Sequence, residues 1–202
     1  MGILVTYFEP FGGDTINASA QAAALLPEAV CGREIISLEL PVVFREAEPR
    51  LCEALKQYRP ELTLCLGQAE GSPALHIERV AVNLRDASRP DNSGDTPQEE
   101  PICPDGPAAY FAALPVKQLA QALRDAGIPA QVSNSAGTYV CNDVMYTLLH
   151  ALSQSGSGAR GGFIHVPLTP EQAAGHPGGA PSLAPSIAAR GLVQIMELML
   201  KE

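Results

Sequence analysis

Apolar residues in this chain gather in short continuous runs, and longer segments with helical spacing lie between these runs. Residues 3–8, 62–67 and 161–167 show no clean polar alternation and end at or near Gly or Pro, as strands buried on both faces do. The partly alternating segment 75–83 and the short segment 131–135 are also predicted to be strands. The predicted strands are therefore 3–8, 34–42, 62–67, 75–83, 131–135 and 161–167.

Helical spacing of apolar residues appears in the segments between these strands. Asn17 or Ser19 can cap the first helix, and Pro49 is expected to shorten or kink the second. Pro115 at the first helical position and Gly127 as a stop signal bound the third. The predicted helices are 17–26, 44–58, 115–128, 139–153 and 186–200.

Two long segments contain no predicted element. Residues 83–107 include five prolines among many Asp, Asn and Gly residues, and a Gly- and Pro-rich loop covers 170–181. Loops of this length are usually functional or disordered. We find no internal repeat and no linker at a domain boundary, so residues 1–202 are expected to form a single domain.

Alternation of strands and helices predicts an α/β fold, with a largely parallel sheet covered on both faces. In such sheets, ligands bind beyond the carboxyl ends of the strands. The loops that follow the strands are therefore the places to search for functional residues.

Composition excludes several classes of protein. The chain has 202 residues, of which 46% are hydrophobic and 17% charged, so its bulk is not disordered. A net charge of −9 argues against binding to nucleic acid or to anionic lipid. Because the chain has no long apolar run and no basic, cleavable leader, we expect no membrane association and a cytoplasmic location.

The cysteines predict neither a disulfide framework nor a zinc site. Their number is odd and no CxxC pair occurs, so we expect free thiols and no metal. The sequence also lacks GxGxxG and GxxxxGK[ST] motifs, so no nucleotide cofactor is expected. The cysteines are Cys31, Cys52, Cys65, Cys103 and Cys141.

Cys141 is the cysteine whose context suggests chemistry. It lies in the first turn of the predicted helix 139–153, where unpaired N–H groups and the helix dipole favour a thiolate. A purely apolar packing role is the alternative. The base required by such a nucleophile is predicted to be His165, which ends strand 161–167 at the edge where Cys141 should emerge. His76 is its main competitor.

The remaining histidines are weaker candidates for the base. His150 is predicted to point away from Cys141, because it lies about half a turn out of phase on the same helix. His176 lies in a loop without a clear role. Glu78, an acid within an apolar strand, is the preferred orienting carboxylate, and Asp91 in the turn RPDNSG is second.

Aromatic residues cluster near the N-terminus although the chain has no Trp. Tyr7, Phe8 and Phe11 fall within five residues, beside Gly12 and Gly13. Such a cluster at a strand end suggests the wall of an apolar pocket, and ordinary core packing is the alternative.

Several of these segments together closely resemble the pyroglutamyl peptidase I family, also called pyrrolidone-carboxylate peptidase. The resemblance spans nearly the whole chain. The motifs, in order, are FEPFGG, GQAEG, IERVAVN, RPDNSG, SAGTYVCN and GFIHVPLTPEQ. It implies a cytoplasmic cysteine peptidase that removes N-terminal pyroglutamate from peptides, on an α/β/α sandwich and usually as a homotetramer, without a cofactor.

The resemblance also implies residue roles. It places the family's nucleophile on Cys141, its base on His165 and its acid on Glu78. The residues that it implies for the substrate pocket are Phe8, Phe11, Gln68, Tyr139 and Val140.

The chain departs from the family pattern at a few positions. Tyr7 stands where the family generally has Gly, GQAEGS replaces GQAGGR, and DASRPDN replaces DARIPDN. The last change moves an arginine from position 88 to Arg89. Two other functions remain open: an inactive binder of small molecules or peptides, and another Cys-His-Glu amide hydrolase. The hydrolase alternative usually shows G-x-C-x-G around its cysteine, which this chain lacks.

Overall fold

A computed structural model describes residues 2–201 of the chain. Most strands belong to one seven-stranded sheet, and two short ones pair separately. The strands are β1 (Ile3–Phe8), β2 (Ala29–Val30), β3 (Arg33–Leu40), β4 (Leu62–Gln68), β5 (Leu75–Glu78), β6 (Val80–Val82), β7 (Ala109–Phe111), β8 (Ala130–Ser133) and β9 (Arg160–Val166). The helices are α1 (Ala18–Ala23), α2 (Ala47–Tyr58), α3 (Val116–Asp125), α4 (Val140–Ser155), α5 (Pro170–Ala174) and α6 (Pro185–Leu200).

The large sheet is mixed, with strand order β2-β3-β1-β4-β9-β5-β8. Strands β3, β1, β4 and β9 are parallel to one another, β5 pairs antiparallel with β9, and β8 is parallel to β5. The predicted α/β class and largely parallel sheet are confirmed. The carboxyl ends of β1, β4 and β9, at Phe8, Gln68 and Val166, therefore meet at one edge of the sheet.

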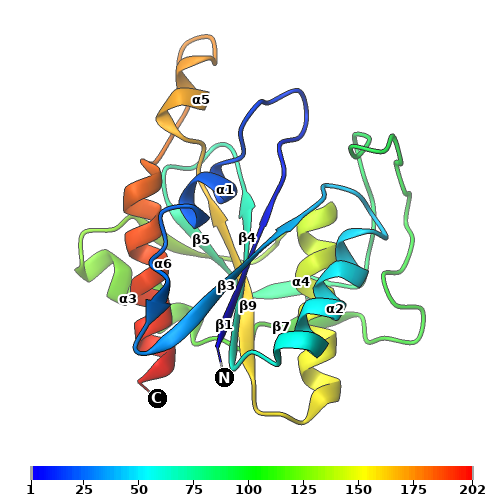
Figure 1. The fold of residues 1–202 in the computed structure, drawn as a ribbon. Coiled ribbons are helices and arrows are strands. Elements are labelled where there is room, and N and C mark those ends of the chain that lie inside the picture. Colours follow the sequence, from blue (N-terminus) through cyan, green and yellow to red (C-terminus); the bar gives the residue numbers. More distant parts are fainter. Residues whose placement is uncertain (1, 202) are drawn as a thin grey trace.

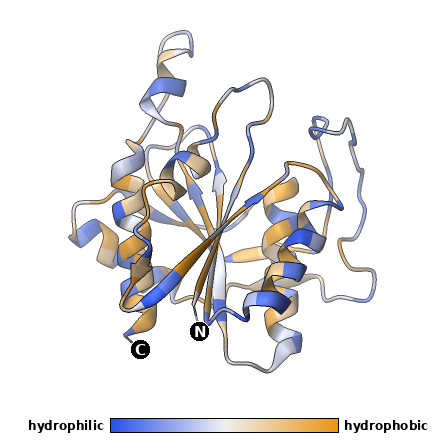
Figure 2. Cartoon of the chain, in the orientation of Figure 1, coloured by the Kyte–Doolittle hydropathy of each residue, from blue (hydrophilic) through white to orange (hydrophobic). Residues whose placement is uncertain are grey.

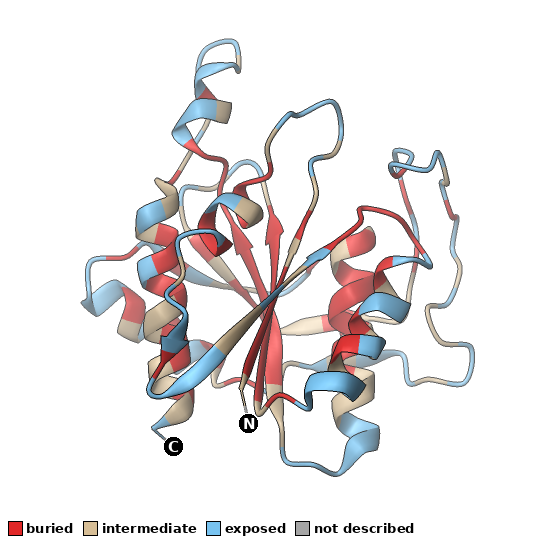
Figure 3. Cartoon of the chain, in the orientation of Figure 1, coloured by how far each residue is buried: buried red, intermediate tan, exposed pale blue. Residues whose placement is uncertain are grey.

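Helices cover both faces of this sheet, which gives three layers (Figure 1). Helices α1, α3 and α6 pack on one face, and α2 and α4 pack on the other. Apolar residues of the helices face the sheet (Figure 2), and the central strands are almost entirely buried (Figure 3). The core is consequently divided into two clusters, one on each side of the sheet.

The predicted strand 75–83 is divided between two sheets. β5 ends at Glu78, Arg79 donates its N–H to the carbonyl of Ser133, and β6 then pairs with β7. The Asn142 side chain accepts a hydrogen bond from the N–H of Val82 and donates one to the Val82 carbonyl. These contacts draw the chain away from β9 and over α4, so a single strand was the wrong prediction.

Other differences are confined to short elements. The predicted helix 44–58 begins only at Ala47, so Pro49 lies in its first turn, where proline is tolerated. The predicted loop 170–181 opens with α5, which has a reciprocal capping box between Thr169 and Gln172. Strands β2 and β7, with two and three residues, were not predicted.

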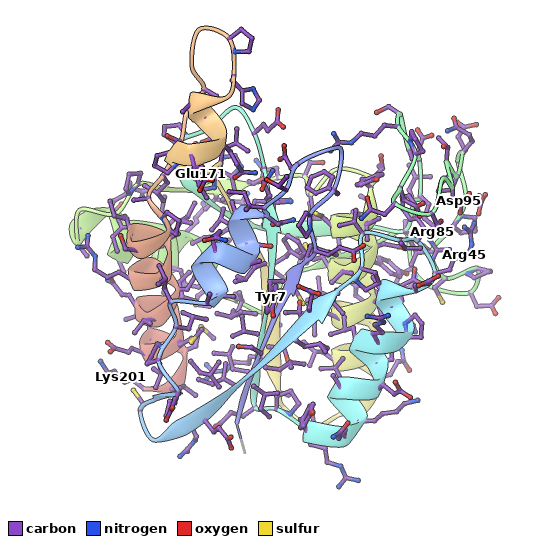
Figure 4. The ribbon with its side chains drawn as sticks, turned by 45° about the horizontal axis from the view of Figure 1, so that its top comes forward. Tyr7, Arg45, Arg85, Asp95, Glu171 and Lys201 are labelled. Atoms are coloured by element: carbon purple, nitrogen blue, oxygen red, sulfur yellow. The ribbon has the colours of Figure 1, made fainter. Side chains whose placement is uncertain are left out.

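The long loop after β6 is fastened to the body of the protein. Arg85 forms a backbone bridge with Glu100, and its buried guanidinium pairs with Asp143 and Glu48. Farther out, Arg45 pairs with Asp95 and Glu100. Figure 4 shows Arg45, Arg85 and Asp95 together on the α2 side of the molecule. The loop is thus held against α4, the helix that contains Cys141.

Candidate active site

Cys141 lies in the first turn of α4, as predicted. Tyr139 is the N-cap of this helix and makes no side-chain capping bond. Because β8 runs opposite to β9, residues 134–139 return the chain to the edge at which β9 ends. There Cys141 is half-buried and lines a cavity together with His165. A methyl group on Gly67 would lie only 3.0 Å from the Sγ atom of Cys141. Glycine at this position therefore leaves the space that the sulfur needs.

His165 and Glu78 form a buried pair beside this sulfur. His165 Nδ1 lies 2.8 Å from Glu78 Oε1, and these residues are 7% and 1% exposed. The register of β5 and β9 produces the contact, because His76 lies opposite His165 and Glu78 follows on the same face of β5. The second oxygen, Oε2, is buried without a hydrogen-bond partner among the described residues.

Electrostatics favour the charged imidazole of His165. Burial alone would lower the pKa of His165. The negative charge of Cys141, its hydrogen bond with the ring, and then the hydrogen bond and charge of Glu78 outweigh burial and raise that pKa to about 10. The arrangement therefore favours the protonated, positively charged imidazole of His165.

The helix turn that contains Cys141 is fixed by its neighbours. The Asn142 side chain binds the backbone of Val82 and donates to the Leu84 carbonyl at 3.1 Å. Both Asp143 carboxylate oxygens lie within 3.0 Å of Arg85 Nε. Buried polar groups satisfied in this way hold a segment in one position. We had not predicted either residue, although a polar pair in an apolar helix is a usable signal.

The cavity in front of Cys141 has a volume of about 150 Å³. All five residues expected in a substrate pocket line it. It is walled mainly by aromatic and aliphatic side chains. The lining is Phe8, Phe11, Asn17, Val42, Gln68, Arg89, Ala136, Tyr139, Val140, Cys141 and His165.

Gln68 is more constrained than we had expected. Its Oε1 accepts hydrogen bonds from the Ala18 N–H at 2.7 Å and from Gln172 Nε2 at 2.9 Å. Its own Nε2 donates to Asp14 Oδ2 at 3.3 Å, and Gln172 Nε2 lies 2.9 Å from the same oxygen. The Gln68 amide thus joins three segments at the cavity wall, a network that single motifs did not reveal.

The departures from the family pattern differ in their relation to the cavity. Tyr7 packs against the opposite cluster of the core, and Ser72 accepts a local bond from the Ala74 N–H. Neither residue lines the cavity. Arg89 does line it, with its guanidinium 4.9 Å from the centre of the Phe11 ring and 5.4 Å from that of Tyr139.

The competing candidates have other partners. His76 Nε2 lies 2.6 Å from Gln131 Nε2, His150 Nδ1 lies 2.8 Å from the Tyr110 hydroxyl, and His176 follows α5. Asp91 accepts bonds from the N–H groups of Ser93 and Asp95 within its turn and from that of Phe44 before α2. None of the four lines the cavity that contains Cys141.

All five cysteines are free. Among residues 2–201, no group of three or more His, Cys, Asp or Glu side chains is placed to hold a metal ion. Within the same residues, no helix is both long and apolar enough to span a membrane.

The site places an imidazole between a thiol and a carboxylate on an α/β scaffold. This arrangement is that of cysteine-dependent amide hydrolases. Comparison with known proteins agrees with this class. Residues 1–202 match the family model described as pyroglutamyl peptidase. The chain therefore belongs to the pyroglutamyl peptidase family, whose members are cysteine peptidases of the pyroglutamyl peptidase I type.

Individual relatives are similar over most of their length. A pyrrolidone-carboxylate peptidase of Thermococcus onnurineus is 46% identical, over 100% of this chain and 98% of the relative. That of Streptomyces coelicolor is 50% identical over 94% of this chain and 88% of its own. The crystal structure of pyroglutamyl peptidase I from Bacillus amyloliquefaciens superposes with a TM-score of 0.93 at 39% identity, covering 100% of this chain and 97% of that one.

The pair of His165 and Glu78 leads to a prediction about pH. Because the hydrogen bond and charge of Glu78 raise the pKa of His165, Glu78→Gln is expected to lower that pKa from about 10. The imidazolium is present below this pKa and is lost above it. The rate of Cys141 alkylation by iodoacetamide is measured against pH. The pH at which this rate changes on the alkaline side is expected to be lower in Glu78→Gln than in wild type. An identical alkaline limb in both proteins would contradict the coupling.

Proposed function

We propose that this protein removes an N-terminal pyroglutamyl residue from peptides, with Cys141 as nucleophile, His165 as acid and base, and Glu78 as the group that orients the imidazole. The observation that supports this most is the cavity itself. Cys141 and His165 open into a small, largely apolar space without a carboxylate in its lining. Such a space suits a flat, neutral lactam and does not suit a charged amino terminus.

The first chemical step forms a thioester. The Cys141 thiolate attacks the exocyclic carbonyl carbon that joins pyroglutamate to the next residue, so an S–C bond forms and the carbonyl oxygen becomes an oxyanion. The C–N bond then breaks, and the leaving amine takes the proton from His165. Glu78 holds the ring in place throughout and stabilises its positive charge whenever His165 carries the second proton.

The oxyanion is stabilised at the start of α4. The first N–H groups of a helix have no partner within the helix, and no side chain caps α4 at Tyr139. These N–H groups lie next to the sulfur in the chain and favour negative charge. Because Asn142 and Asp143 fix this turn, the donors are oriented before substrate binds.

Hydrolysis of the thioester restores the enzyme. Water attacks the acyl carbon as it gives a proton to His165, and the S–C bond then breaks. Pyroglutamate leaves as a carboxylic acid, and the thiolate beside the imidazolium is regenerated. No cofactor takes part in either step as proposed.

Recognition of the ring is assigned to two aromatic residues. Phe8 is buried at the end of β1 and Phe11 lies in the following loop, and both line the cavity. We propose that these side chains contact the faces of the lactam, with Gln68, Tyr139 and Val140 completing the pocket. The Gln68 amide is held by Ala18, Asp14 and Gln172, so its role is to keep the wall in place.

A fluorogenic assay tests the activity and the nucleophile together. Wild type is expected to release the fluorophore from a pyroglutamyl amide and to leave a prolyl amide intact, because proline would bring a charged amine into the apolar cavity. Cys141→Ser is expected to abolish release. A folded wild type that cleaves neither amide would contradict the proposal and would favour an inactive binder.

Substitution of the aromatic wall tests the pocket. Phe8→Ala and Phe11→Ala are expected to raise KM more than they lower kcat, since the rings contact the substrate away from the scissile bond. Leu25→Ala, at an exposed position that does not line the cavity, serves as a control. Unchanged KM in both phenylalanine variants would remove these residues from the pocket.

We also propose that the whole chain forms one catalytic domain, that it acts in the cytoplasm and that it assembles as a homotetramer. The five free cysteines are consistent with a reducing compartment, and the tetramer rests on the family resemblance.

Sedimentation velocity at several protein concentrations checks the assembly. A species of four chains is expected, with subunits of 21.2 kDa. A single monomeric species at all concentrations would contradict the tetramer.

A further inference from the structure

One permanent charge lies in the lining of the cavity. Among the described residues that line it, Arg89 is the one that is always charged. The protein as a whole has a net charge of −9. The positive charge of Arg89 therefore lies where the substrate must enter, in a protein that is negatively charged overall.

Contacts with aromatic rings hold the Arg89 side chain at the cavity. Its guanidinium lies 4.9 Å from the centre of the Phe11 ring and 5.4 Å from that of Tyr139. A methyl group on Gly12 would lie 3.8 Å from Nη1, so the group reaches across to the loop after β1. Packing of this kind restricts the side chain and lowers the entropy that binding would cost.

The guanidinium still has donors available for a ligand. No carboxylate among residues 2–201 forms an ion pair with Arg89, whereas Arg85 pairs with two. Arg89 is also exposed, which places it at the mouth of the cavity. A planar guanidinium in this state is well suited to a carboxylate, which it can bind through two hydrogen bonds.

The proposed reaction determines what lies at this mouth. The pyroglutamyl ring occupies the cavity of about 150 Å³, so the residue on the other side of the scissile bond lies outside it. Arg89 and Tyr139 also line a second, outer hollow of about 380 Å³. The leaving part of the peptide thus passes beside the guanidinium.

We propose that Arg89 is a specificity-determining residue that binds the α-carboxylate of the residue following pyroglutamate, so that the enzyme favours pyroglutamyl dipeptides over their neutral amides. This inference rests on the proposed function. Asp86 lines the outer hollow and acts in the opposite sense, because its carboxylate repels the same group.

Matched substrates and variants test the inference. The substrates are pyroglutamyl-alanine and pyroglutamyl-alaninamide, which differ only in the terminal charge, and the measured quantity is the ratio of their kcat/KM values. Wild type is expected to favour the free acid about twofold to fivefold, as for an exposed ion pair, and less at high salt. Arg89→Gln is expected to bring the ratio to one or below, and Arg89→Lys to retain part of it.

Two further variants separate local charge from other effects. Asp86→Asn is expected to increase the ratio, because it removes the repulsion and leaves the backbone contact of residue 86 with Thr138. Arg50→Gln, an exposed position on α2, removes an equal charge elsewhere and is expected to leave the ratio unchanged.

The outcomes separate this inference from the proposed function. Equal kcat/KM for the two substrates in wild type would overturn the role of Arg89 and leave the peptidase activity established. An equal loss on both substrates in Arg89→Gln would also overturn it and would assign Arg89 only to packing on Phe11. Failure of wild type to cleave either substrate would overturn both proposals.

Discussion

The hydrogen bond between Glu78 and His165 is the interaction on which the rest of the site depends. Glu78 is 1% exposed, and a carboxylate so deeply buried is costly unless it is paired. The pairing holds the imidazole ring and stabilises its positive charge next to Cys141. Because the partners come from β5 and β9, the sheet must form before the site exists.

Reversal of strand direction makes this contact possible. β5 enters the sheet antiparallel to β9 with His76 opposite His165, so Glu78 lies diagonally across from the histidine. β8 follows the direction of β5, and residues 134–139 then return the chain to α4. Asn142 secures that return by binding the backbone of β6. The mixed sheet is thus a requirement of the site.

Sequence patterns indicated the candidate residues of the site better than the contacts that hold them. Cys141, His165 and Glu78 were selected as candidates because each is an unusual residue for a helix start, a strand end or an apolar strand, and the structure brings them together. The end of the strand at Glu78 could not be identified from the sequence, because Val80–Val82 continues the apolar pattern. Only contacts with Asn142 and β7 redirect the chain there. The Gln68 amide network could not be predicted either, since it joins residues that are remote in the chain.

The protonation state of His165 is the most direct test of this account. Histidine labelled with ¹⁵N, observed by NMR at pH 8, reports whether both ring nitrogens of His165 carry protons, and Cys141→Ala removes the sulfur as a comparison. A pKa of about 10 predicts an imidazolium in wild type at this pH, with proton loss at lower pH in Cys141→Ala. A neutral His165 ring in wild type at pH 8 would contradict the proposed thiolate–imidazolium pair.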